Sequence, residues 1–211
     1  MKYSQNNEQE IVEAFFNGFV GRCFSVGEND GQTLSNVKSL IDKGWDAVLI
    51  EPSETAFNKL IELHKDNPKV LCYKLALSNF NGEADFFESS EHLGIGDTSL
   101  LSSLSFEETK RWSKESFTKN KTQVSTFKDF MIDKLFQTFD LISIDAEGVD
   151  FLILEQINLY KTKTAMVIVE WNSKNFNKFD NYFKQYSFKL HDKNHENLIY
   201  VSALDRRKFN S

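Results

Sequence analysis

The loop GENDG, residues 27–31, carries the first residues in the chain whose types suggest ligand binding. It follows a short apolar run, and Gly27 and Gly31 permit positive φ angles and a close approach of a ligand to the backbone. The spacing G-x-x-x-G differs from the G-x-G-x-x-G pattern that binds a dinucleotide pyrophosphate. Glu28 and Asp30 would repel a pyrophosphate and tolerate or prefer a cationic ligand. The alternative is that the two glycines only turn a strand into a helix.

Acidic residues follow two further apolar runs. Glu51 ends the run AVLI, residues 47–50, where an acid can accept hydrogen bonds from both hydroxyls of a ribose. Asp145 and Glu147 follow the run FDLIS and could orient an acceptor group, bind a metal or take a proton. The alternative for these two acids is a favourable interaction with the dipole of the next helix. Because no third ligand is evident beside them, we predict no metal site.

Short strand-like runs alternate with helical periodicity through most of the chain. The strand-like runs lie at 22–26, 47–50, 70–77, 83–88, 139–145, 165–171, 186–191 and 197–202. Helices are expected from about Gln32 to Gly44, from Ser53 to Asn67, from Ser125 onward, over 149–157 and over 174–185. This alternation predicts a doubly wound, mostly parallel sheet with helices on both faces. The last two runs predict a terminal hairpin that adds an antiparallel strand.

The predicted sheet brings the candidate residues together. In a doubly wound sheet a ligand binds beyond the carboxyl ends of the strands, where the strand order reverses. The glycine loop lies there, and the helix from about Gln32 would point its N-terminus at the ligand. In the order 3-2-1-4, Asp145 and Glu147 emerge beside that loop. The same order separates Cys23 and Cys72 by two strand positions, so they should remain free thiols.

Length and composition favour one domain over residues 1–211. Residues 1–20 contain one amphipathic helix around Ile11, Phe15 and Phe16. Residues 89–123 show no clear strand pattern, and we interpret them as an insertion with a helix over 106–117. Its aromatic residues either pack that helix or contact a ligand: Phe106, Trp112 and Phe117.

Charge and hydropathy bear on the partners. The net charge is −6, which argues against non-specific binding of nucleic acid. No apolar run is long enough to span a bilayer, and the polar N-terminus lacks the apolar core of a signal peptide. We therefore expect a cytoplasmic protein that binds neither nucleic acid nor membrane.

Five segments, in order, resemble a known family. They are VGENDGQTLSN, GWDAVLIEPSETAFNKL, ALSNFNGEADF, FDLISIDAEGVDFLILE and VIVEWN, within residues 22–202. Together they resemble the FkbM family of S-adenosylmethionine-dependent methyltransferases. The resemblance implies a seven-stranded sheet of order 3-2-1-4-5-7-6 whose seventh strand is antiparallel. It also implies S-adenosylmethionine as the methyl donor and a hydroxyl, often on a sugar or small natural product, as the acceptor.

The resemblance further implies roles for individual residues. The donor would be bound by Ser25, Gly27, Glu28, Asn29, Gly31, Glu51, Pro52, Ser53, Ala76, Leu77 and Ser78. Within this set, Glu51 would hold the ribose and residues 76–78 would line the adenine side. Asp145 would take a proton from the acceptor or orient it, with Glu147 as support. Glu170 and Asn172 are weaker candidates for the acceptor site, which the 89–123 insertion would cover.

Ser25 departs from the family pattern. The family usually has an acid at this position, two residues before the first glycine, and the acid helps to hold the amino-acid end of the donor. Whether Glu28 compensates from inside the loop is left open. The departure keeps a non-catalytic protein that binds the donor as the main alternative. A nicotinamide-dependent oxidoreductase is opposed by the loop spacing, and for a non-enzymatic interaction domain the ordered motifs would be a coincidence.

Overall fold

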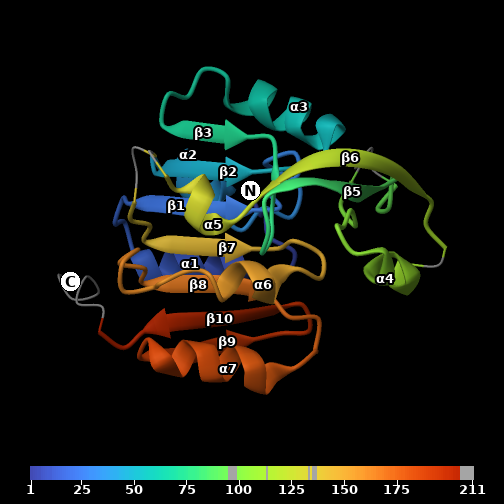
Figure 1. The fold of residues 1–211 in the computed structure, drawn as a ribbon. Coiled ribbons are helices and arrows are strands. Elements are labelled where there is room, and N and C mark those ends of the chain that lie inside the picture. The colour runs from blue at the N-terminus through green and yellow to red at the C-terminus, as the bar shows by residue number, and fades with distance from the viewer. Residues whose placement is uncertain (95–98, 113, 133, 135–136, 205–211) are drawn as a thin grey trace.

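The computed structural model describes residues 1–94, 99–112, 114–132, 134 and 137–204 (Figure 1). Its centre is a seven-stranded sheet of order β3-β2-β1-β7-β8-β10-β9. The strands are β1 (Arg22–Val26), β2 (Asp46–Ile50), β3 (Val70–Tyr73), β7 (Leu141–Ile144), β8 (Met166–Glu170), β9 (Phe188–Lys193) and β10 (Asn197–Ser202). β3, β2, β1, β7 and β8 pair in parallel, while β10 is antiparallel to both neighbours. The predicted order and the antiparallel seventh strand are therefore confirmed.

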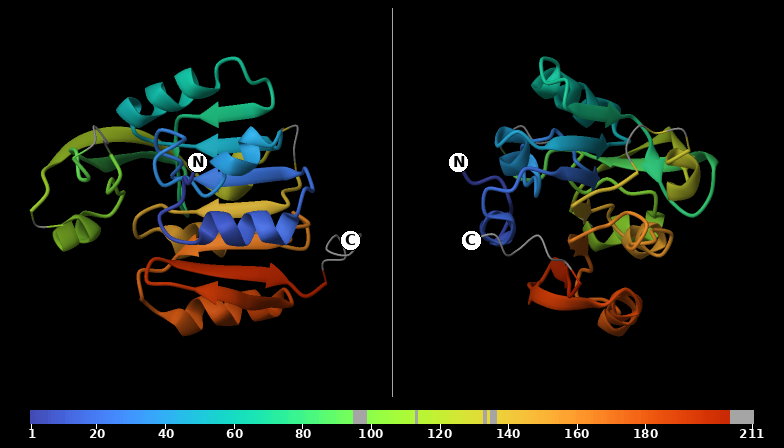
Figure 2. Two further views of the ribbon diagram at one scale, coloured as in Figure 1. Left: turned by 180° about the vertical axis from the view of Figure 1, so that it is seen from behind. Right: turned by 90° about the vertical axis from the view of Figure 1, so that its left-hand side faces the viewer.

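Helices cover both faces of this sheet. Apolar residues of α1 (Glu8–Phe16), α2 (Lys38–Asp42) and α3 (Glu54–His64) pack into one core cluster. Those of α5 (Phe127–Phe130), α6 (Asp150–Leu154) and α7 (Phe176–Gln185) pack into the other. Figure 1 shows α5 and α6 in front of the sheet, and Figure 2 shows α1 and α2 from behind. Successive residues of a strand face opposite clusters, as Cys23 and Phe24 do.

A second sheet of order β4-β6-β5 was not predicted. It consists of β4 (Ala76–Leu77), β5 (Gly82–Ser89) and β6 (Phe117–Ser125). The prediction that residues 89–123 lack a strand is therefore wrong, and the predicted strand over 70–77 is interrupted after Tyr73. Most of β6 is exposed, so its sequence shows no apolar alternation. Lys119 and Lys121 instead pair with Asp85 of β5, at 2.7 and 2.9 Å.

Several helices are shorter than predicted, among them α6, which spans Asp150–Leu154 rather than 149–157. α2 begins at Lys38 rather than near Gln32, because the hydroxyl of Ser35 accepts the Lys38 amide at 3.0 Å. The helix after β6 begins after Thr126 and ends at Phe130. The helix predicted over 106–117 is α4 (Phe106–Thr109) followed by a 3-10 turn to Trp112.

Two further sequence expectations are met. Ser53 caps α3, because its hydroxyl accepts the amide of Ala56. Cys23 and Cys72 are free thiols. Within the described part of the chain, every helix is too short or too polar to cross a bilayer.

Candidate active site

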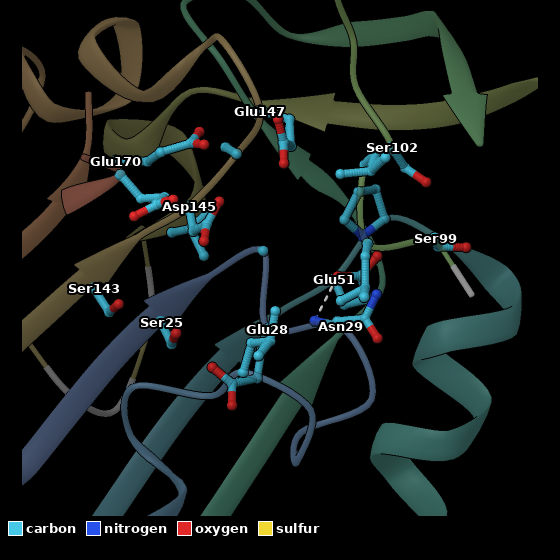
Figure 3. A pocket seen from close by; sticks show the side chains of 18 of the residues that line it. Ser25, Glu28, Asn29, Glu51, Ser99, Ser102, Ser143, Asp145, Glu147 and Glu170 are labelled. Atoms are coloured by element: carbon cyan, nitrogen blue, oxygen red, sulfur yellow. Dashed lines mark hydrogen bonds between the residues drawn. The ribbon is translucent and has the colours of Figure 1, made fainter. Parts of the chain in front are cut away.

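A pocket of about 240 Å³ lies beyond the carboxyl ends of the central parallel strands (Figure 3). Its walls come from segments far apart in the chain. They include the glycine loop after β1, the residues after β2, β7 and β8, and the segment between β5 and β6. This is the switch point of the sheet, where β1 lies between β2 and β7 and the chain winds in opposite directions on either side.

Gly27 joins the glycine loop to the end of β7. Its φ is +75°, and a Cβ at this position would lie 1.7 Å from the carbonyl oxygen of Asp145. The amide of Asp145 donates to the carbonyl of Val26 at 3.0 Å, and the amide of Gly27 donates to Ile50 of β2. Only glycine fits this contact. The close approach is to protein backbone, and it places Asp145 directly beside the loop.

Glu51 ties the end of β2 to the same loop. Its carboxylate accepts the amides of Asn29, at 2.8 Å, and Ser53, at 2.7 Å. The side chain is buried, and burial raises the pKa of Glu51 to about 8 although these two hydrogen bonds oppose the shift. Each carboxylate oxygen has a second lone pair, so the residue can still accept hydrogen bonds from a ligand.

The glycine loop itself contains two acids, Glu28 and Asp30, and they differ in position. Glu28 lines the pocket, is buried, and accepts the hydroxyl of Ser35 at 2.6 Å. Burial raises the pKa of Glu28 to about 7. Asp30 does not line the pocket, because its carboxylate accepts the amides of Gln32 and Thr33 and closes a turn. Of these two acids, only Glu28 therefore lines the pocket.

Four acids form what we call the acidic wall: Asp145, Glu147, Asp150 and Glu170. Burial and mutual repulsion raise the pKa of Asp145 to about 7, and burial raises that of Asp150 to about 6. Burial and repulsion by the neighbouring acids raise the pKa values of Glu147 and Glu170 well above the ordinary range. The buried Oε2 atoms of Glu147 and Glu170 have no hydrogen-bond partner among the described residues. Figure 3 shows Asp145, Glu147 and Glu170 along one side of the pocket.

The acidic wall also supplies the ligand types of a hard cation. Asp145, Asp150 and Glu170 each bring one carboxylate oxygen within 4.8 Å of the others. The premise that no third ligand accompanies Asp145 and Glu147 is therefore wrong, because the fold brings Asp150 and Glu170 beside Asp145. Both oxygens of Asp150 accept backbone amides, those of Ala146 and Gly148. Burial and mutual repulsion account for the raised pKa values of these acids, and we assign no metal.

The segment between β5 and β6 forms another wall of the pocket and contacts the acidic wall, because the hydroxyl of Ser103 donates to the carbonyl of Glu147. Trp112 lines the pocket, and its ring lies 5.3 Å from that of His92. The buried Nε1 of Trp112 has no hydrogen-bond partner among the described residues. Arg111 also lines the pocket and pairs with Glu108 at 2.6 Å. This wall therefore combines an aromatic face, a hydrogen-bond donor and a neutralised cation.

Comparison with known proteins identifies the family. A model of the methyltransferase FkbM domain matches residues 25–194. The chain belongs to the FkbM methyltransferase family. No curated protein sequence matches this FkbM domain. Its family and fold are those of S-adenosylmethionine-dependent methyltransferases.

Several solved structures share the fold of this FkbM domain at low sequence identity. The METTL16 methyltransferase domain has 10% identity and a TM-score of 0.54, over 94% of this chain and 67% of that chain. TrmK of M. capricolum, in complex with S-adenosyl-homocysteine, has 9% identity and a TM-score of 0.52, over 97% and 70%. Monomeric WbdD has 12% identity and a TM-score of 0.51, over 94% of this chain. The FkbM domain spans only 41% of the WbdD chain.

The FkbM domain brings most of the predicted site residues into the one pocket. Those that line it are Ser25, Gly27, Glu28, Asn29, Glu51, Pro52, Ala76, Leu77, Asp145, Glu147, Glu170 and Asn172. Three predicted donor contacts lie outside the lining. Gly31 faces α3, where its Cβ would lie 2.5 Å from Leu60 Cδ1, and Ser53 is the cap of α3. Ser78 links β6 to the residues that follow α6, because its amide donates to Ser125 and its carbonyl accepts Gln156 Nε2.

Sequence reasoning missed several residues of the pocket. Trp112 was a candidate and lines it, whereas Phe106 and Phe117 do not. Gln5, His92 and Arg111 line the pocket without belonging to a recognisable motif. Gln5 arrives there because Ser4 forms a β-bridge with Leu34, after the glycine loop. No short-range pattern could have indicated these contacts.

Proposed function

We propose that this FkbM domain transfers a methyl group from S-adenosylmethionine to a hydroxyl of a sugar or small natural product. The observation that carries the proposal is that the predicted donor and acceptor residues line the same pocket. One part of it is lined by Gly27, Asn29 and Glu51, and another part by Asp145 and Glu147. A donor held by the first set would present its reactive carbon to an acceptor held by the second. Alignment of this kind supplies most of the acceleration in a methyl transfer.

The donor end fits a cationic nucleoside. Glu51 can accept hydrogen bonds from ribose hydroxyls, and Ala76 and Leu77 offer apolar surface for a base. The pocket is rich in carboxylates, which favours a positively charged ligand. When bound, S-adenosylmethionine supplies an electrophilic methyl group on a sulfonium centre.

The acceptor end fits a hydroxyl. An alcohol is a poor nucleophile, so a base that takes its proton speeds the reaction. Asp145 has a pKa of about 7 and lies beside the glycine loop, so near neutral pH it can take a proton. Glu147 supports this role from beside Asp145, whose negative charge helps to raise the pKa of Glu147. Asp150 fixes the intervening loop by accepting the Ala146 and Gly148 amides at 2.7 and 3.0 Å.

A sugar or similar polyol matches the two walls of the acceptor end. The unpartnered Oε2 atoms of Glu147 and Glu170 can each accept a hydrogen bond from a hydroxyl. Asn172 donates to Glu170 and orients it. Trp112 lines the same pocket and offers an apolar face and an indole donor. The net charge of −6 favours a small molecule or glycan over nucleic acid, and we propose that the reaction takes place in the cytoplasm.

Calorimetric titration with S-adenosylmethionine, S-adenosylhomocysteine and NAD tests the donor site. We expect micromolar binding of the first two ligands and none of NAD. Glu51→Ala should abolish the binding of both adenosyl ligands. Gly18→Ala is the control and should bind them normally, because Gly18 lies at an exposed turn with open space around its Cβ. Folded protein that binds neither adenosyl ligand would refute the proposal, and binding of NAD alone would favour an oxidoreductase.

Transfer of labelled methyl groups tests the reaction. The enzyme is incubated with methyl-labelled S-adenosylmethionine and a panel of sugars, glycans and natural-product alcohols. Label on an acceptor oxygen supports the proposal, and label on nitrogen or carbon contradicts the O-methyl assignment. Donor binding without transfer to any acceptor would favour the non-catalytic alternative.

A further inference from the structure

Glu28 is a buried carboxylate in the pocket that the proposed reaction does not yet use. Its side chain is 4% exposed, and it lies on the glycine loop between Gly27 and Asn29. The hydroxyls of Ser25 and Ser35 donate to it, the latter at 2.6 Å. In Figure 3 its carboxylate turns away from Glu51, toward the side of the loop where Ser25 lies. Glu28 and Glu51 therefore mark two separate ends of the donor region.

No described cation pairs directly with Glu28, although the charge of Lys38 favours its ionised form. No described lysine, arginine or histidine forms a salt bridge with it, and the nearby Lys38 is paired with Asp42. A buried carboxylate without a cation is unfavourable, even when hydroxyls donate to it. A ligand that brings a positive charge would remove this penalty.

The residues around Glu28 form a small polar end of the pocket. Ser25 pairs in register with Ser143 of β7, and the side chain of Asn36 donates to the Ser143 hydroxyl at 3.3 Å. All of these residues line the pocket. They are small or neutral, so Glu28 supplies the charge at this end.

We propose that Glu28 binds the α-ammonium group of the methyl donor, in the place of an acid at position 25. This inference rests on the proposed function, because it assumes that S-adenosylmethionine occupies the pocket with its ribose at Glu51. An ammonium group has three donors and no acceptor, so it matches a carboxylate that receives only hydroxyls. Ser25 keeps a supporting role, because its hydroxyl orients Glu28.

Two probes and three variants test this assignment by calorimetry. S-adenosylmethionine carries the ammonium group, and 5′-methylthioadenosine has the same nucleoside without the amino-acid end. For Glu28→Gln we expect S-adenosylmethionine to bind about 10- to 100-fold more weakly, the effect of losing a charged hydrogen bond. Binding of 5′-methylthioadenosine should change less than about twofold. Glu51→Gln is the matched control, and it should weaken both probes because both contain the ribose.

A charge swap completes the test. Ser25→Asp in the Glu28→Gln background should recover most of the lost affinity for S-adenosylmethionine, whereas Ser25→Asp alone should give no gain, because two carboxylates then repel each other. Equal binding of S-adenosylmethionine by Glu28→Gln and wild type would overturn the inference. An equal loss of affinity for both probes in Glu28→Gln would also overturn the inference. So would a double variant that recovers no affinity for S-adenosylmethionine. Failure of the wild type to bind S-adenosylmethionine would instead refute the proposed function.

Discussion

Replacing Gly27 by alanine tests whether the glycine loop contacts the end of β7 as described. A Cβ at this position would lie 1.7 Å from the carbonyl oxygen of Asp145, and the backbone has a φ of +75°. Gly18 has a similar φ of +80°, but no atom lies within 4 Å of its Cβ position. Gly18→Ala is the matched control, because it has the same backbone strain without the contact.

The cost of the left-handed backbone and the cost of the Cβ contact can be separated by comparing the two variants. A left-handed backbone conformation costs an alanine about 1–2 kcal/mol in both. In Gly27→Ala the end of β7 must also move by about 1.3 Å to restore a separation of 3.0 Å. Overpacking of this kind costs about 1–3 kcal/mol. We expect Gly27→Ala to lower the free energy of unfolding by about 1–3 kcal/mol more than Gly18→Ala.

Urea unfolding followed by circular dichroism measures both free energies. In thermal unfolding, the extra loss should lower the Tm by about 2–4 °C for each kcal/mol. Methyl transfer should fall about 100-fold in Gly27→Ala, because a shift of about 1 Å misplaces Asp145. Equal destabilisation of the two variants, within about 0.5 kcal/mol, would refute the contact between Gly27 and Asp145.

Three further predictions concern the pocket. Gly31→Ala should destabilise the protein by about 1–2 kcal/mol but leave donor affinity unchanged, because Gly31 faces Leu60; a calorimetric loss of donor affinity would contradict this placement. Because the pKa of Asp145 is raised from 3.8 to about 7, the native state binds this proton more tightly. Stability should therefore fall as the pH rises from about 4 to about 7, whereas the rate should rise through about 7. Asp145→Asn should flatten the rate profile, make the fall of stability with pH less steep and lower kcat by about 10²- to 10⁴-fold; an unchanged pH–rate profile would exclude Asp145 as the base. The acids that face it and share this titration are Glu147, Asp150, Glu170, Glu8, Glu28 and Glu196. Trp112→Phe should raise the acceptor KM by about 2- to 10-fold at constant donor affinity, through loss of the indole donor; an unchanged KM in steady-state kinetics would remove Trp112 from the acceptor site.

The central strands of the large sheet could be predicted because they are buried on both faces. β1, β2, β7 and β8 are short apolar runs, and polar loops mark their ends. β6 could not be predicted in this way, because it is mostly exposed and pairs with β5 through a backbone ladder that leaves no apolar alternation in its sequence. The start of α2 was also misjudged. There the side-chain hydroxyl of Ser35 accepts the amides of Val37 and Lys38, and this cap lies later than the apolar spacing suggests.

The residues of the candidate site also divide into those that the sequence could predict and those that it could not. Gly27, Glu51 and Asp145 follow strands, so strand order alone brings them together. Arg111 and Gln5 reach the pocket through long connections whose paths depend on tertiary packing. Gly31 was misplaced because a glycine required for packing on a helix has the same sequence signature as one required for a ligand.

The distribution of acids in the pocket bears on how the proposed reaction handles charge. Methyl transfer removes the positive charge from the donor sulfur, so a carboxylate held beside that sulfur would stabilise the reactant more than the transition state. Glu28 and Glu51 are assigned to the ammonium and ribose ends of the donor, at a distance from the reacting carbon. The raised pKa of Asp145 keeps the acidic wall partly protonated near neutral pH. The wall can therefore gain the acceptor proton as the charge on sulfur is lost, so that the two changes offset each other within a buried site.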